Sequence, residues 1–210
     1  MRQSEHDARE AFLHYVEQAV HLAGDERDRL RLHLHPRTLS RGEALVREGD
    51  RCHEIGFVGQ GVLRVYFLSD GDDLTAYFAT EGHTVSDYES FLSGEPSRVN
   101  IEAAEDAVLA VLTREGVRWA YAELRHGERL GRLIAERLLV ATHRRLASFY
   151  LDSAEERYRK LVREQPGLVQ RVPQHLVASY VGVRPQSLSR IRRRIAEESV
   201  ALREGGGPSP

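Results

Sequence analysis

The spacing of apolar residues changes along the chain. Residues 5–23 and 25–33 have apolar positions at helical spacing, which predicts two short amphipathic helices that pack as a lid. Between Thr38 and Leu112 the apolar residues form short runs or alternate with polar ones, which predicts an antiparallel series of strands. Glycines at roughly ten-residue intervals predict turns with positive φ: Gly42, Gly49, Gly61, Gly71 and Gly82. The pattern favours a small barrel or jelly roll.

From Arg114 to Leu151 the strand pattern is replaced by helical spacing without an internal proline, which predicts one long helix. Its apolar stripe consists of Leu130, Ile134, Leu138 and Ala141. Other apolar residues widen this surface beyond one stripe, which predicts that the helix packs against two neighbouring elements. One would be the same helix of a second subunit, giving a homodimer. The alternative is a helix packed only on its own barrel.

Ser153, followed by Glu156, predicts a capping box at the start of a new helix that ends at Gln165-Pro166-Gly167. We therefore place a domain boundary at Ser153. The predicted organisation is a β-rich domain with N-terminal helices at 1–113, a long helix at 114–152, a DNA-binding domain at 153–203 and a disordered tail at 204–210.

The charge is distributed unevenly. The whole chain has a formal net charge of −2, but residues 153–203 contain eleven Lys and Arg against five Asp and Glu, a net charge of +6. A polyanionic partner would therefore bind the C-terminal end.

Residues 172–195, VPQHLVASYVGVRPQSLSRIRRRI, have the features of a helix-turn-helix. This unit needs a small residue where its helices cross, here Ala178, and a glycine in the tight turn, here Gly182. The inward positions are all apolar: Val177, Val181, Val183, Leu188 and Ile191.

The second helix of this unit is predicted to begin near Pro185 and to direct a polar, basic face away from the core. That face consists of Gln186, Ser187, Ser189, Arg190, Arg193 and Arg194. Arginine can donate two hydrogen bonds to guanine, glutamine can pair with adenine, and serine can hold phosphate. The face suits a reader of double-stranded DNA; the alternative is a solvated basic helix that binds nothing.

With these motifs the chain resembles the Crp/Fnr transcription regulators. The family pattern on the recognition helix is Glu-x-x-Ser-Arg, and Ser189-Arg190 matches its second half, whereas Gln186 departs from it. The resemblance implies an α+β fold: an N-terminal antiparallel β-roll that resembles cyclic-nucleotide-binding domains, a long dimerisation helix and a C-terminal winged helix-turn-helix. It also implies a homodimer on a two-fold symmetric DNA site, an unknown small-molecule effector and RNA polymerase as a further candidate partner.

The resemblance also places an effector pocket. Ser86 and Asp87 stand where the family has a Gly-Glu pair for the ribose, and Arg98 falls near the phosphate-binding arginine. Aspartate is shorter than glutamate and the glycine is lost, whereas Arg98 could still bind an anion. The partial match disfavours a cyclic nucleotide and leaves another small ligand or a vestigial pocket as alternatives. The sequence identifies no cofactor.

The sequence gives little support to other classes of protein. The sequence has no GxSxG, GxxxxGK[ST] or HExxH motif, so we expect no enzyme. A single cysteine, Cys52, cannot hold an iron–sulfur cluster, and no metal site is expected. No stretch of about 18 apolar residues predicts a membrane span, and a cytoplasmic location is expected. The alternative function is a sensor module that acts through protein partners, which would not require residues 172–195.

Overall fold

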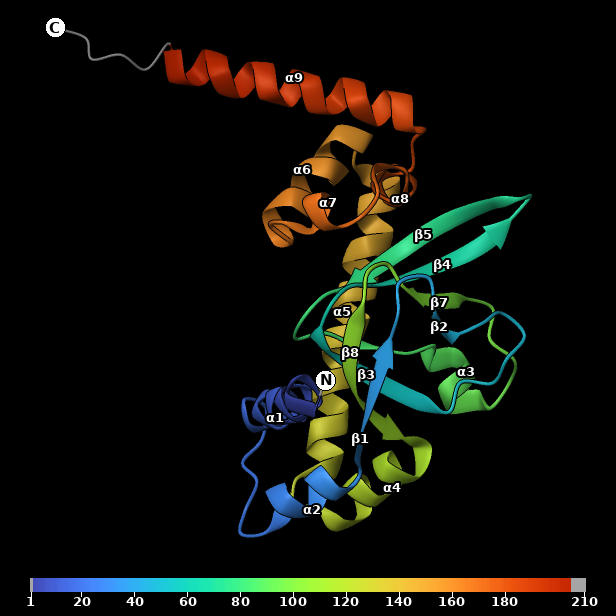
Figure 1. Cartoon of the computed structure of the whole chain (residues 1–210), viewed down its shortest axis with the longest axis vertical. Helices are drawn as coiled ribbons and strands as arrows, with labels where there is room; N and C mark the ends of the chain where they lie inside the picture. Colours follow the sequence, from blue (N-terminus) through green and yellow to red (C-terminus); the bar gives the residue numbers. More distant parts are fainter. Residues whose placement is uncertain (1, 205–210) are drawn as a thin grey trace, which may run out of the picture. The chain divides into compact units, whose positions relative to one another are not determined.

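The computed structural model describes residues 2–204, and the chain divides into two compact units, Met1–Leu146 and Ala147–Pro210. The N-terminal unit contains eight strands (Figure 1): β1 Leu34–Leu39, β2 Ala44–Val46, β3 Glu54–Gln60, β4 Leu63–Ser69, β5 Asp72–Ala79, β6 Thr84–Val85, β7 Asn100–Ala103 and β8 Ala107–Thr113. Its helices are α1 Arg2–Glu17, α2 Glu26–Leu32, α3 Tyr88–Ser93, α4 Arg114–Glu123 and most of α5 Gly127–Leu151. The C-terminal unit contains α6 Ala154–Glu164, α7 Leu168–Arg171, α8 Gln174–Val181 and α9 Pro185–Glu204.

The strands form two four-stranded antiparallel sheets, in the orders β1-β8-β3-β6 and β2-β7-β4-β5. This confirms the predicted antiparallel β-roll. The five glycines expected in turns all have positive φ. Gly61 shows why: a Cβ there would lie 2.5 Å from the carbonyl oxygen of Asp106, so the turn between β3 and β4 admits no side chain.

The sequence of β8, AVLAVLT, is apolar without alternation because both faces of its sheet are covered. Leu109 and Val111 face the second sheet and belong to the cluster between the two sheets. Ala110 and Leu112 face the other way and pack with α1, α4 and α5. The N-terminal helices thus cover the outer face of the first sheet, although α1 ends at Glu17, six residues earlier than predicted.

The predicted long helix at 114–152 is two helices, because the chain turns at residues 124–126 between α4 and α5. Leu124 has extended backbone angles, and a Cβ on Gly127 would lie 1.9 Å from the carbonyl oxygen of Ala120. Gly127 therefore lets the start of α5 approach α4. A single glycine in a helical pattern is tolerated in many helices, so the sequence pattern did not reveal this break.

Glu26 holds this turn from α2. Its carboxylate accepts hydrogen bonds from the backbone N–H of Ala23, at 2.7 Å, and of Arg125, at 2.5 Å. The bond from Arg125, followed by that from Ala23, lowers the pKa of Glu26 below its usual value. The Glu26 side chain is buried, and both hydrogen bonds are partly buried.

We expect Glu26→Gln to lower the free energy of unfolding of the N-terminal unit at neutral pH by about 1–3 kcal/mol, because one partly buried N–H loses its acceptor. A lowered pKa gives stability that is present above the usual pKa and lost as the pH falls through the folded-state value. The difference from the wild type should therefore shrink at about pH 4 and below. Urea unfolding, monitored by the fluorescence of Trp119, measures both the loss of stability at neutral pH and its change with pH. Glu123→Gln, which breaks the exposed ion pair with Arg29, is the control; an equal effect of the two variants would contradict this role of Glu26.

The boundary between the two units lies within α5, at Leu146, rather than at Ser153. The capping box at Ser153 is present: its hydroxyl accepts from the N–H of Glu156, whose carboxylate accepts from the N–H of Ser153. Residues 147–204 contain no strand, so the described chain lacks the wing implied by the resemblance. Of the predicted tail, Glu204 ends α9, and 205–210 lie outside the described residues. None of the described helices is long and apolar enough to span a membrane.

Candidate functional site

The C-terminal unit has the geometry of a helix-turn-helix formed by α8 and α9. Ala178, Val177 and Val181 are fully buried on α8, and Leu188 and Ile191 are buried on α9. Val183, in the turn, is half-buried. The inward positions proposed from the sequence therefore lie in the core of this unit.

The turn between α8 and α9 depends on Gly182, which has a φ of +74°. The N–H of Val183 donates to the carbonyl of Ala178 and the N–H of Gly182 to that of Ser179, which is the Schellman pattern of a helix C-terminus. A side chain other than glycine would be strained at this φ. The sharp turn sets the start of α9 at Pro185, as the sequence predicted.

Arg157 of α6 fixes the same turn, and the sequence analysis missed it. Its Nε donates to the carbonyl of Val181 at 2.8 Å, and its Nη1 donates to the carbonyls of Asp152 and Phe149 at 2.5 and 3.3 Å. The guanidinium also lies over the ring of Phe149. One side chain thus joins the end of α5, the start of α6 and the end of α8. No local pattern signals it, because its acceptors are backbone carbonyls.

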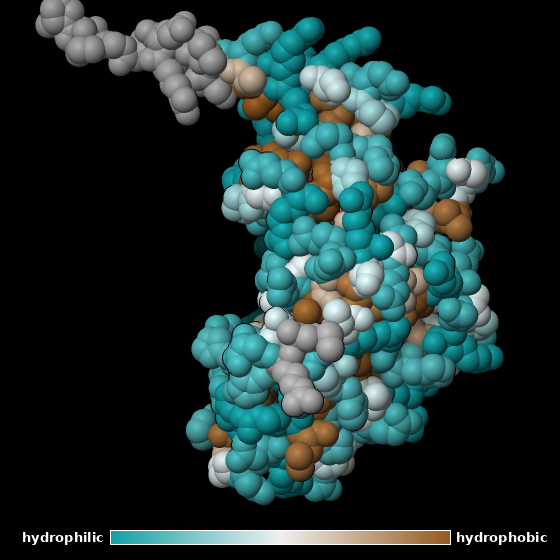
Figure 2. Space-filling model, in the orientation of Figure 1, coloured by the Kyte–Doolittle hydropathy of each residue, from teal (hydrophilic) through white to brown (hydrophobic). Residues whose placement is uncertain are grey.

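The predicted DNA-reading residues lie on α9, but they differ in accessibility. Gln186, Arg190, Arg193 and Arg194 are exposed, whereas Ser187 is half-buried. The hydroxyl of Ser189 donates to the carbonyl of Pro185 at 3.1 Å, within its own helix. The space-filling view shows the side of α9 that faces the viewer as predominantly hydrophilic (Figure 2).

The arginines on α9 have different partners. Arg194 pairs with Glu155 of α6 at 2.7 Å, and Arg193 lies 3.8 Å from Glu197. Arg190 forms no ion pair with any described residue. Arg184, just before α9, is also exposed; the sequence analysis omitted it because it precedes the helix. Arg190 is therefore the member of the predicted face whose guanidinium is most available to a ligand.

The three residues proposed for the effector pocket make different contacts. Asp87 is buried at the N-terminus of α3, where it accepts from the N–H groups of Glu89 and Ser90 and, at 2.6 Å, from the hydroxyl of Ser97. The Ser86 hydroxyl donates to the carbonyl of Glu54, whereas Arg98 is exposed. The carboxylate of Asp87 is thus used in holding α3, and Arg98 faces solvent. The effector role proposed for these three residues stays a prediction.

The stripe proposed for dimerisation is partly occupied within the chain. Leu130 is buried among residues of α1, α4 and the first sheet, and Ile134 packs against the same cluster. Ala141 is exposed, and Leu138 is 37% exposed. Other apolar residues of α5 are more exposed, notably Leu139 at 61% and Leu146 at 52%. Within this chain, the first part of α5 packs on its own β-roll, and the dimer contact of this helix stays a prediction.

Comparison with known proteins agrees with this architecture. The profile of the family described as cyclic nucleotide-binding domain matches residues 36–123. No curated protein sequence matches the chain.

Several solved structures have a similar fold. FixK2 from Bradyrhizobium japonicum superposes with a TM-score of 0.68 at 17% identity, over 79% of this chain and 86% of that one. A putative transcriptional regulator of the Crp/Fnr family from Eubacterium rectale gives a TM-score of 0.64 at 17% identity, over 84% and 85%. The catabolite activator protein of Thermus thermophilus is 25% identical, with a TM-score of 0.51 over 89% and 88%. Residues 36–123 thus match the family described as cyclic nucleotide-binding domain, and the fold of the chain is similar to that of these solved structures.

Proposed function

We propose that this protein is a DNA-binding transcription regulator that acts as a homodimer on a two-fold symmetric site. The observation that carries the proposal is the combination of a fully packed helix-turn-helix with an exposed, basic face on its second helix. A surface helix in a bundle would not need the buried crossing at Ala178 and the sharp turn at Gly182. A helix that enters the major groove needs both.

In this proposal, the exposed side chains of α9 have separate roles. Arg190, which has no ionic partner among the described residues, donates two hydrogen bonds to guanine, and Gln186 contacts an adjacent base. Arg193, whose contact with Glu197 is long and exposed, binds phosphate, and Arg194 does so only if it leaves Glu155. The specificity of the protein would then depend mainly on Arg190.

Two copies are needed because a single helix-turn-helix contacts few base pairs. In a dimer, two recognition helices enter successive major grooves about 34 Å apart. The exposed apolar residues of α5, Leu139 and Leu146, are seven residues apart and so lie on one face of the helix. We expect this face to form the dimer interface.

We expect Arg190→Ala to weaken binding to the preferred sequence by about 1–3 kcal/mol, a loss of roughly 5- to 150-fold, while binding to unrelated DNA changes little. Genomic fragments are incubated with purified protein at near-physiological salt without added ligand, and the retained fragments are sequenced. The wild type should enrich one palindromic motif that the variant fails to enrich. Arg163→Ala, on an exposed position of α6, is the matched control and should retain the motif.

An equal loss on all sequences would remove Arg190 from base recognition and leave it as a phosphate contact. Absence of enrichment by the wild type would contradict sequence-specific binding by the ligand-free protein. Retention of protein partners in place of DNA would favour the alternative, a sensor module that acts through other proteins.

A further inference from the structure

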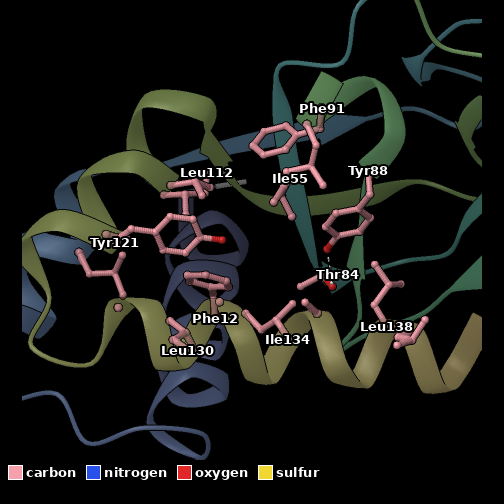
Figure 3. Close-up of a pocket in the computed structure, with 18 of the residues that line it drawn as sticks. Phe12, Ile55, Thr84, Tyr88, Phe91, Leu112, Tyr121, Leu130, Ile134 and Leu138 are labelled. Carbon is pink, nitrogen blue, oxygen red and sulfur yellow. Dashed lines mark hydrogen bonds between the residues drawn. The ribbon is translucent and has the colours of Figure 1, made fainter. Parts of the chain in front are cut away.

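The N-terminal unit contains a cavity of about 400 Å³ between the β-roll and α5. Its wall is formed by side chains from α1, α2, α3, α4, α5, β3, β6 and β8. In the close-up, Leu130, Ile134 and Leu138 of α5 lie on one side, and Ile55, Tyr88 and Phe91 lie opposite (Figure 3). A volume of this size is typical of sites for small ligands. None of the residues predicted for an effector, Ser86, Asp87 and Arg98, lines it.

The wall of the cavity is almost entirely apolar. Among the described residues that line it, none carries a charge, and the polar side chains are hydroxyls: Thr84, Tyr88, Tyr121 and Thr142. The Tyr88 hydroxyl donates to the hydroxyl of Thr84 at 3.3 Å (Figure 3). Burial raises the pKa of Tyr88, so its phenol is neutral and can still accept a hydrogen bond.

This chemistry excludes an anionic ligand. Moving a phosphate or carboxylate from water into an apolar wall is costly unless a cation or several donors compensate for its lost hydration. None of the described residues that line the cavity is a cation, and their hydroxyls are too few. A neutral molecule with an apolar body loses little hydration and gains from burial.

We propose that this cavity binds a neutral, largely apolar small molecule, one polar group of which bonds to the hydroxyls of Tyr88 and Thr84. Its use as an effector site rests on the proposed function, whereas the binding itself does not. The proposed ligand site is separate from Ser86, Asp87 and Arg98, none of which lines the cavity.

The position of the cavity would let a bound ligand influence other parts of the chain. Helix α5 contributes eight lining residues, from Gly127 to Thr142, and α3 contributes three. A ligand that touches α3 and α5 together favours the arrangement in which both contacts are made. Since α5 continues to Leu151, beyond the unit boundary at Leu146, occupancy would bias the helix that leads to the DNA-binding unit.

Two fluorescent probes test the chemistry directly. N-phenyl-1-naphthylamine is neutral and apolar, and 8-anilinonaphthalene-1-sulfonate has the same rings with a sulfonate. We expect saturable fluorescence enhancement of the neutral probe at one site per chain, and affinity for the sulfonate lower by about tenfold or more. An excess of cyclic AMP should not displace the neutral probe. Equal affinity for the two probes, or displacement by cyclic AMP, would overturn the proposal.

Variants locate the probe in the cavity. Ile134→Trp fills it from α5 and should weaken binding of the neutral probe by about tenfold or more. Val140→Trp is the matched control, because Val140 is on the same helix but does not line the cavity; it should leave binding unchanged. Ala135→Leu, at an exposed lining position, gives a milder test if the larger change prevents folding, which circular dichroism detects. Unchanged binding in a folded Ile134→Trp or Ala135→Leu variant would overturn the assignment.

A second copy of the chain is the competing occupant, because Leu139, which we expect in the dimer interface, also lines the cavity. Light scattering over a concentration series, with the neutral probe present, distinguishes a small ligand from a second copy of the chain as the occupant. We expect the probe to remain bound when the dimer forms. A probe signal that falls as the dimer forms would assign this surface to the dimer interface and overturn the ligand proposal. The DNA selection depends on α9 and uses no ligand. Failure of probe binding with successful DNA selection would therefore contradict the cavity proposal alone. Failure of DNA selection with successful probe binding would contradict the proposed function alone.

Discussion

Replacing Leu146 with aspartate is expected to convert the protein into a monomer and to weaken its binding to a two-fold symmetric DNA site by about 10²- to 10⁴-fold. The aspartate would place a charge in the apolar interface that we expect on α5, and a monomer loses the gain that comes from binding both half-sites together. Light scattering gives the oligomeric state, and a titration of labelled palindromic DNA gives the affinity. Binding to a single half-site should change little.

Ala141→Asp is the control for this experiment. Ala141 is exposed on the same helix but belongs to the stripe inferred from the sequence, five residues before Leu146 and on a different side. We expect this variant to remain dimeric. A monomeric Ala141→Asp with a dimeric Leu146→Asp would show that the sequence stripe, not the exposed face found in the structure, forms the interface.

Leu188→Ala is expected to lower the free energy of unfolding of the C-terminal unit by about 2–5 kcal/mol and to abolish specific DNA binding. Leu188 is 1% exposed in the contact between α8 and α9, so truncation leaves a cavity at the crossing of the two helices. Urea unfolding distinguishes the units, because the only tryptophan of the chain, Trp119, lies in the N-terminal one. Far-UV circular dichroism should show an early loss of helix while the tryptophan transition stays in place.

Two controls accompany Leu188→Ala. Leu188→Met keeps the volume and should cost less than about 1.5 kcal/mol, and Arg163→Ala changes an exposed residue of α6 that is not on the predicted DNA-reading face. Wild-type stability of Leu188→Ala would contradict the packing role of Leu188. Lost DNA binding at unchanged stability would place Leu188 in the interface with DNA instead.

The features predicted correctly from the sequence depend on residues close together in the chain. The capping box needs only Ser153 and Glu156, and the helix-turn-helix needs Ala178, Gly182 and their apolar neighbours within about 20 residues. Alternation of apolar residues and turn glycines predicted the antiparallel strands in the same way. Such signals survive folding because the interactions that they report are local.

The errors arise where distant segments meet. The break between α4 and α5 depends on Gly127 against Ala120 and on Glu26, a hundred residues away in the chain. The hydrogen bond from Ser97 to the carboxylate of Asp87 was not predicted, because Ser97 lies across a loop. The apolar cavity could not be predicted either, since eight elements contribute to it. Contacts between segments that are distant in the chain leave no periodic pattern in the sequence.

The contacts of Arg157 determine where the molecule can bend. This side chain ties the carbonyls of Phe149 and Asp152 to that of Val181, so three hydrogen bonds join the last turn of α5 to the helix-turn-helix. A reorientation of the C-terminal unit that kept these bonds would be taken up before Phe149, within the exposed part of α5. The hinge of this protein would then be a stretch of continuous helix, and its stiffness, rather than the length of a linker, would set how widely the two recognition helices can spread.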